Sequence, residues 1–198
     1  KNISTRFYHR TIKKKIFIMK FQAVKGINII QKRIFTIDEC KKIIDAKTEK
    51  VSYYNRTYKN ERENIVIKND NEQKWIRERI EKEVDDINRR YYGFRNLKLQ
   101  DEIGLRDYSQ GNEYTNFKWH HDDICESRLS ISILLNEDFD GGDLDIFVGQ
   151  FVKQTRKAGV ITTFPTHLIH QVSEVTRGSR KALITFANGK DLEKDIYI

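Results

Sequence analysis

From about Leu97 onward, apolar and polar residues alternate with a period of two, and this pattern constrains the fold more than any other feature of the chain. Such alternation is typical of β-strands with one buried face. It is clearest where Leu129, Ile131, Ile133 and Leu135 alternate with Ser130 and Ser132. Further short runs, separated by turn signals at Asp140-Gly141-Gly142, Pro165 and Gly178, cover residues 144–148, 160–164, 168–173 and 180–187. Closely spaced strands without intervening helices predict a mainly β (α+β) fold, with an antiparallel sandwich or barrel over residues 97–190.

A helical support is predicted ahead of this region, over residues 36–90. Thr36-Ile-Asp-Glu39 has the pattern of a capping box, and the helix that it begins runs to about residue 47 with one apolar face: Ile37, Cys40, Ile43 and Ile44. A second helix starts at Asp70 or Asn71 and runs to about Arg90, with apolar residues at helical spacing: Ile76, Ile80, Val84 and Ile87. Residues 51–64 show no clear period, so we expect a mobile surface loop there, unusually rich in tyrosine.

The composition favours one folded domain. The chain has 198 residues, of which 38% are hydrophobic, enough to bury one sizeable core. Of its net charge of +8, residues 1–20 contribute +7, because they carry seven Lys or Arg and no acid, and residues 21–198 contribute +1 from 30 basic and 29 acidic side chains. We therefore interpret residues 1–20 as a basic tail and residues 21–198 as the domain. One interpretation is that the tail is a solvated segment, or that the natural protein starts at Met19, the only methionine, and residues 1–18 are not part of it. The alternative is that the tail binds nucleic acid or a membrane surface.

Cysteine usage and hydropathy predict a cytoplasmic setting. Cys40 and Cys125 lie far apart without a CxxC pattern, which favours two free, reduced thiols. The longest apolar runs, such as residues 16–19, are far shorter than a membrane span, and no signal cleavage site follows the basic residues before them. We expect no membrane partner for the domain.

The segment Trp119-His-His-Asp-Asp123 suggests a metal site. Residues two apart on an extended segment share a face, so either His120 with Asp122 or His121 with Asp123 can present an imidazole and a carboxylate to one point. A third ligand is available from the second histidine cluster, His167 and His170. Two imidazoles and one carboxylate with open positions form the arrangement used by non-haem Fe(II) oxygenases, although zinc remains an alternative.

Strand parity then separates the members of the distal cluster. His170 shares a face with Leu168 and Val172 and is predicted to point inward, whereas His167 lies near the turn and is predicted to be exposed or to support the site from behind. Arg180 shares the inward face of the last strand with Ala182, Ile184 and Phe186. A buried guanidinium needs an anion, either a distant Asp or Glu or, as we favour, the carboxylate of a ligand.

Taken together, these motifs resemble those of the Fe(II)/2-oxoglutarate-dependent dioxygenases, in particular the prolyl 4-hydroxylase-like branch with its PKHD-type hydroxylases. The resemblance rests on three stretches between residues 26 and 190: Tyr108-Ser-Gln-Gly111 with Tyr114 and Trp119-His-His-Asp122; Arg128 to Asn136 with Gly141-Gly-Asp-Leu144; and Phe164-Pro-Thr-His-Leu-Ile-His170 through Gly178-Ser-Arg180. In two places the chain departs from the branch. About three extra residues separate Tyr114 from Trp119, and Leu134 stands where some animal members have a cosubstrate-binding tyrosine.

The resemblance implies a double-stranded β-helix (jelly-roll) core and an enzyme that uses Fe(II), 2-oxoglutarate and O2, with ascorbate as a candidate activator. It selects His120, Asp122 and His170 as metal ligands and Arg180 as the residue that binds the cosubstrate carboxylate. Thr162 is a candidate hydroxyl partner of Arg180, and Tyr108 is a candidate donor to the cosubstrate or the substrate, or else a core tyrosine. The predicted reaction is hydroxylation of an unactivated C–H bond, with release of succinate and CO2. The substrate-binding candidates lie in the long stretch before the metal motif and in the tyrosine-rich segment: Tyr114, Trp119, Tyr53 and Tyr54.

Three functions remain open at this point. The first is hydroxylation of a prolyl or similar residue in a peptide or protein. The second is oxidation of a free amino acid, another small metabolite or a nucleobase; the near-neutral domain argues against nucleic acid, outside the tail. The third is a catalytically inactive jelly roll that acts as a binding module, which the presence of all three candidate ligands and Arg180 disfavours.

Overall fold

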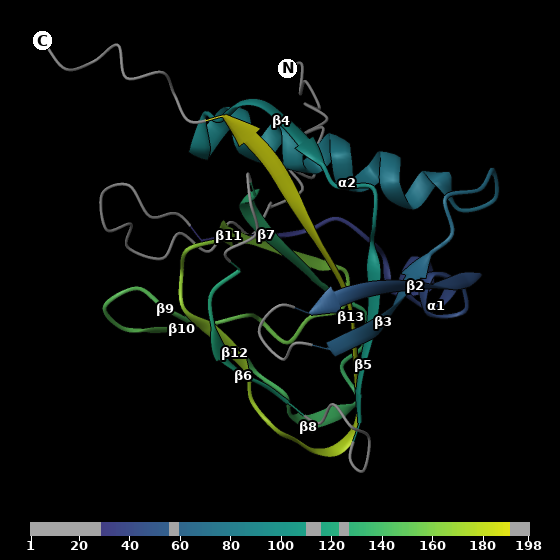
Figure 1. Cartoon of the computed structure of the whole chain (residues 1–198). Coiled ribbons are helices and arrows are strands. Elements are labelled where there is room, and N and C mark those ends of the chain that lie inside the picture. The colour runs from purple at the N-terminus through teal and green to yellow at the C-terminus, as the bar shows by residue number, and fades with distance from the viewer. Residues whose placement is uncertain (1–28, 56–59, 110–115, 123–126, 191–198) are drawn as a thin grey trace, which may run out of the picture.

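The computed structural model describes residues 29–55, 60–109, 116–122 and 127–190, without the side chains of residues 53–63. Strands dominate these ranges (Figure 1). The first half contains β1 (Ile30–Arg33), α1 (Ile37–Ile44), β2 (Thr48–Asn55), β3 (Asn60–Ile67), α2 (Lys74–Ile87), the π-helical turn η1 (Asn88–Tyr92), β4 (Arg95–Leu99) and β5 (Gly104–Ser109). The second half contains β6 (Phe117–His120), β7 (Ser127–Leu134), β8 (Phe139–Gly141), β9 (Leu144–Phe147), β10 (Phe151–Lys153), β11 (Val160–Pro165), β12 (His170–Val172) and β13 (Val175–Lys190).

Two antiparallel sheets form the core of the fold, as the mainly β prediction requires. The larger sheet has nine strands in the order β1-β11-β7-β13-β5-β3-β2, with β4 and β8 also paired to β13. The smaller sheet has the order β10-β9-β12-β6. Strands that are distant in sequence are neighbours in both sheets, since β1 pairs with β11 and β6 pairs with β12. The two sheets therefore bring the two histidine clusters of the sequence together.

One face of the larger sheet packs against the helices. The capping box forms as predicted, because Thr36 accepts a hydrogen bond from the Glu39 amide and Glu39 accepts one from the Thr36 amide. The predicted apolar residues of α2 are all buried, and they join α1 and the sheet in one core cluster: Ile76, Ile80, Val84 and Ile87. Each such side chain contributes roughly 1.5–3 kcal/mol through burial. Ile37 is the exception to the predicted face of α1, since it is 43% exposed at the first helical position.

A hairpin replaces the predicted mobile loop at residues 51–64. Strands β2 and β3 pair in register from Thr48 with Ile67 to Asn55 with Asn60, and Val66 of β3 pairs with Gly104 of β5. The loop prediction was wrong because it relied on apolar alternation. Only one pair connects the hairpin to β5, so most of its length extends beyond the core and does not need a continuous apolar face.

The other face of the larger sheet packs against the smaller sheet and forms a second core. Its members come from both sheets and include Tyr108, Leu134, Phe164, Ile146 and Val172. Strand β7 is consequently buried on both faces, not on one as predicted, and Ser130 and Ser132 are each 3% exposed. The same holds for β13, where Arg180 and Leu183 lie on opposite faces and are both buried. Gly178, predicted to mark a turn, lies inside β13 with a φ of +74°.

No helix among the described residues is both long enough and apolar enough to cross a membrane.

Candidate metal centre and carboxylate pocket

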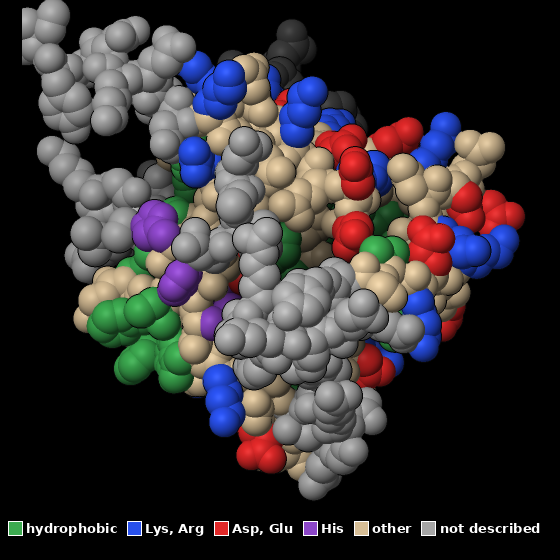
Figure 2. All heavy atoms as spheres, viewed as in Figure 1, with side chains coloured by type: hydrophobic (Ala, Val, Ile, Leu, Met, Phe, Trp, Pro, Cys, Tyr) green, Lys and Arg blue, Asp and Glu red, His purple; other side chains and the backbone are tan. Residues whose placement is uncertain are grey.

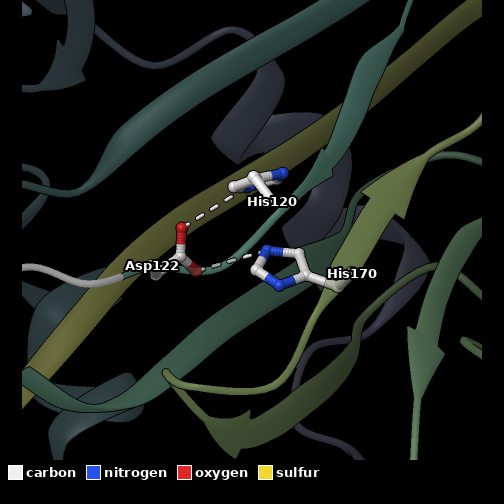
Figure 3. A group of neighbouring side chains, drawn as sticks. All are labelled: His120, Asp122 and His170. Atoms are coloured by element: carbon white, nitrogen blue, oxygen red, sulfur yellow. Dashed lines mark ion pairs between the residues drawn. The ribbon is translucent and has the colours of Figure 1, made fainter. Parts of the chain in front are cut away.

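Three side chains from two neighbouring strands of the smaller sheet converge between the two sheets. His120 ends β6, Asp122 follows two residues later, and His170 begins β12 opposite His120. His120 Nε2 lies 3.5 Å from Asp122 Oδ1, and His170 Nε2 lies 3.3 Å from Asp122 Oδ2 (Figure 3). One ligand atom from each residue lies within 4.8 Å of the other two. We refer to these three residues as the triad.

Backbone carbonyls fix both imidazole rings. His120 Nδ1 donates to the carbonyl of Lys118 at 2.7 Å, and His170 Nδ1 donates to the carbonyl of Leu168 at 2.9 Å. Because a carbonyl only accepts, each ring carries its proton on Nδ1 and presents the lone pair of Nε2 to the triad. Both rings are therefore oriented as metal-binding histidines usually are.

Asp122 is held as an anion. Ser130 Oγ donates to Asp122 Oδ2 at 2.7 Å, and the Asp122 amide donates to the carbonyl of Thr166 at 2.9 Å, which ties the first motif to the loop before His170. Burial alone would raise the pKa of Asp122, but the neighbouring side chains of His120 and His170 and the hydrogen bond from Ser130 outweigh it and hold the pKa well below its usual range.

The donor set fits a divalent transition metal. Two imidazole nitrogens and one carboxylate oxygen on one side of a point match the facial arrangement of non-haem Fe(II), and the same three donors are also compatible with catalytic zinc. The other two histidines of the two clusters do not join the triad. His121 and His167 are both exposed, and Asp123 lies outside the described residues.

Arg180 lies buried in the second core with no anion beside it. It is 1% exposed, and its guanidinium carbon lies 5.3 Å from the centre of the Tyr108 ring. Burial lowers its pKa, and among the described residues no carboxylate forms an ion pair with it. Its Nη1 has no hydrogen-bond partner there. Gly142 leaves room for the side chain, since a Cβ at that position would lie 3.1 Å from Arg180 Cδ.

Gln154, which the sequence analysis did not single out, links Arg180 to Thr162. Arg180 Nη2 donates to Gln154 Oε1 at 3.2 Å, and Gln154 Nε2 donates to Thr162 Oγ1 at 2.8 Å. Thr162 pairs with Ser132, whose buried Oγ has no partner among the described residues. A ligand carboxylate would satisfy both Arg180 Nη1 and Ser132 Oγ. No local pattern marks Gln154, because it follows a three-residue strand, β10.

Phe117, which was not predicted, and the predicted Trp119 lie on opposite faces of the smaller sheet. Phe117 shares the face of His120, is 37% exposed, and packs edge-on against that imidazole with ring centres 4.2 Å apart. Trp119 lies on the opposite face, 43% exposed and 5.5 Å from Phe151, so the structure does not bring it to the triad. Figure 2 shows histidine side chains in a row beside a hydrophobic patch. Tyr114 and the side chains of Tyr53 and Tyr54 lie outside the described residues.

Residues 104–188 match the family model of the 2OG-Fe(II) oxygenase superfamily. This range contains the triad, Ser130, Gln154 and Arg180. Over these residues, which make up less than half of the chain, the sequence is similar to this superfamily.

One curated protein and two solved structures are also similar to this chain. A PKHD-type hydroxylase from Sphingopyxis alaskensis is 39% identical over 61 residues, which are 29% of this chain and 28% of the relative, so the match spans less than a third of that protein. A 2OG-Fe(II) oxygenase family oxidoreductase from Burkholderia pseudomallei has a similar structure, with a TM-score of 0.58 and 15% identity over 84% of this chain and 88% of the other. A Trichoplax adhaerens prolyl hydroxylase, solved with a peptide fragment of the hypoxia inducible factor oxygen degradation domain, gives 0.60 and 12% over 84% of each chain. The two structures confirm the predicted jelly-roll fold.

Proposed function

We propose that this oxygenase is an Fe(II)- and 2-oxoglutarate-dependent hydroxylase that acts on a prolyl or similar residue of a peptide or protein and releases succinate and CO2. The observation that carries the proposal is the pairing of two features in one core: the converged triad, and a buried Arg180 whose Nη1 has no partner among the described residues. The first fits a metal, and the second fits the distal carboxylate of a dicarboxylic cosubstrate.

Each residue then has a defined role. His120, Asp122 and His170 would hold Fe(II), and Arg180 would bind the cosubstrate carboxylate, with Thr162 and Tyr108 beside it. When bound, Fe(II) with 2-oxoglutarate and O2 supplies the oxidising power that hydroxylates an unactivated C–H bond. Ascorbate would serve as a reductant that keeps the iron ferrous.

The surrounding side chains orient these groups and exclude water. Phe164 packs edge-on against His170 with ring centres 4.8 Å apart, and Phe117 does the same against His120. Ser130 donates a hydrogen bond to Asp122 Oδ2, and the backbone carbonyls of Lys118 and Leu168 accept hydrogen bonds from the imidazole rings of His120 and His170. These contacts hold the three side chains of the triad in place, which reduces the reorganisation that metal binding requires.

A peptide substrate is favoured over a small molecule by two observations. The similar Trichoplax adhaerens enzyme was solved with a peptide. In addition, Phe117 is 37% exposed on the face of His120, where its ring can contact a peptide side chain beside the triad. Oxidation of a free amino acid, metabolite or nucleobase is the second candidate, and a non-catalytic binding module is disfavoured by the complete triad.

Turnover of 2-oxoglutarate tests the proposal. The full chain, supplied with Fe(II), ascorbate and O2, is expected to release succinate slowly without substrate and faster with prolyl peptides from a screen. His170→Ala should abolish release, and Arg180→Ala should raise the 2-oxoglutarate requirement at least about tenfold. Absence of succinate from the native protein, or an unchanged requirement in Arg180→Ala, would contradict the assignment.

A further inference from the structure

A second arginine faces the space between the two sheets. Arg106 lies on β5 between Gly104 and Tyr108, and alternation places all three on one face, whereas Leu105 packs into the core on the helix side. Arg106 is half-buried, and its side chain folds back over Gly104, where an added Cβ would lie 2.9 Å from Arg106 Nη1. The guanidinium therefore lies against the inner wall beside the β2–β3 hairpin.

This guanidinium has one neutral partner and no carboxylate among the described residues. Arg106 Nη2 donates to Asn64 Oδ1 at 2.7 Å. The adjacent acid, Asp107, lies on the other face of β5, where it pairs with Lys181 and Ser179. The positive charge of Arg106 nevertheless affects Tyr108, which lies beside Arg180. Burial raises the pKa of Tyr108, and the positive charges of Arg180 and Arg106 oppose that rise.

The strand register places Arg106 away from Arg180 and Ser132, the residues proposed to bind the cosubstrate carboxylate. Gly104 pairs with Ile184 on β13, and Ile184 pairs with Ser132 on β7, so the guanidinium above Gly104 lies two strands, about 10 Å, from Ser132. Ser130, the next residue on that face of β7, holds the carboxylate of the triad. Arg180 pairs four residues further along β5, at Tyr108, about 13 Å from Gly104. Because Arg106 lies this far from Arg180 and Ser132, its guanidinium is better placed to bind a group of the substrate than the cosubstrate.

We propose that Arg106, together with Asn64, binds a carboxylate of the substrate, so that this oxygenase selects substrates with an anionic group near the carbon that it oxidises. The planar guanidinium fork matches a carboxylate, and Asn64, whose oxygen already accepts from Arg106, has its NH2 group left to donate to the same anion. The carboxylate has two chemical sources: the side chain of Asp or Glu in a peptide, or the α-carboxylate of a free amino acid. This inference rests on the proposed function.

The inference is tested in the iron-loaded full chain by changing the charge of the substrate and the charge at position 106. The probes are capped prolyl peptides made with Asp, Asn or Lys at each flanking position, and free proline with its amide. Native protein should prefer the Asp peptides over the Asn peptides by about tenfold to a hundredfold in kcat/KM, or free proline over its amide if the α-carboxylate is the source. Arg106→Gln should remove that preference with kcat largely retained, and Arg106→Glu should transfer it to the Lys peptides, a gain that lost stability cannot produce.

Controls separate this inference from the proposed function. Arg90→Gln, at an exposed arginine in η1, should keep the native preference. Succinate release without substrate should have the same 2-oxoglutarate requirement in Arg106→Gln as in the native protein. A raised requirement would mean that Arg106 holds the cosubstrate, and equal rates for Asp, Asn and Lys peptides and for proline and its amide would overturn the inference while leaving the hydroxylase assignment intact. Loss of all succinate release from the native protein would instead refute the proposed function, and the inference with it.

Discussion

Gln154 Oε1 accepts a hydrogen bond from Arg180 Nη2 at 3.2 Å, inside a core where Arg180 meets no carboxylate among the described residues. The amide is oriented from its other end, because Gln154 Nε2 donates to Thr162 Oγ1 at 2.8 Å. One edge of the guanidinium is therefore fixed by a neutral group, and Nη1 stays available for a ligand. A glutamine gives this support without cancelling the charge that an anionic cosubstrate requires.

Gln154→Glu should impair cosubstrate binding. The new carboxylate would pair with Arg180 and compete with the ligand, so we expect the KM for 2-oxoglutarate to rise at least about tenfold while Fe(II) affinity stays near the native value. Steady-state succinate release and metal titration measure the two quantities. Gln150→Glu, at an exposed glutamine four residues earlier, is the matched control and should behave as native. An unchanged KM in Gln154→Glu would contradict this role.

Ser130 and Ser132 should have separable effects, although they share one face of β7. Ser130 donates to Asp122, so Ser130→Ala should weaken metal binding about tenfold to a hundredfold. The unpartnered Ser132 hydroxyl lies beside Thr162, so Ser132→Ala should raise the 2-oxoglutarate requirement and leave metal affinity unchanged. Titration with Fe(II), followed by titration with 2-oxoglutarate, distinguishes the two. Equal effects of both substitutions on metal affinity would argue against this division.

Gly142→Ala should cost both stability and cosubstrate binding. Gly142 has a φ of +60°, and an added Cβ would lie 2.9 Å from Val175 Cγ2 and 3.1 Å from Arg180 Cδ. We expect the free energy of unfolding to fall by about 2–4 kcal/mol. Gly149→Ala has a similar φ of +81° but no atom within 4 Å, so it should cost about 1 kcal/mol and leave the 2-oxoglutarate requirement unchanged. Urea denaturation compares the two, and equal losses would show that Arg180 is not crowded.

Cys40 should be unreactive in the folded protein. It lies on the buried face of α1 and is 1% exposed, and burial raises the pKa of its thiol to about 11. In a Cys125→Ala background, alkylation should be far slower in buffer than in urea. Because the unfolded thiol ionises near about pH 8.5, the folded state should lose stability as the pH rises from there toward 11. Equal alkylation rates in buffer and urea, or stability that increases over this range, would contradict the prediction.

Much of the fold could be predicted because local and global signals agree. The capping box at Thr36 and the apolar spacing of α2 depend only on near neighbours, and both helices form in the predicted regions, although α1 ends at Ile44 and not near residue 47, and α2 begins at Lys74 and not at Asp70 or Asn71. The β2–β3 hairpin escaped prediction because it lies mostly beyond the core and does not require alternation. The burial of β7 and β13 on both faces was not predicted either. Alternation of Ser and Ile predicts that Ser faces solvent and Ile faces the core, whereas in the structure each face of the strand packs against a core of its own.

The triad could be predicted because strand parity limits the first cluster to two His–Asp pairs and points His170 inward, and the family resemblance then selects His120 with Asp122. His120, Asp122 and His170 converge as expected, while His121 and His167 are exposed. Gln154, Phe117 and Arg106 could not be found in this way. Gln154 and Arg106 act through a neighbour that only the sheet order brings close: Arg180 for Gln154, and Asn64 for Arg106. Phe117 contacts His120 of the same strand, across a register shift that strict strand alternation does not predict. For Arg106, a cation two residues before Tyr108 on the same strand face was the available signal.

An anaerobic optical titration tests whether the triad and Arg180 serve one metal and one cosubstrate. Fe(II) and 2-oxoglutarate added together to the native protein should produce a visible charge-transfer band, which neither produces alone. The band should persist in His121→Ala, disappear in His120→Ala and His170→Ala, and require more 2-oxoglutarate in Arg180→Ala. A native protein without the band, or a band that survives in His170→Ala and is lost in His121→Ala, would contradict the assignment.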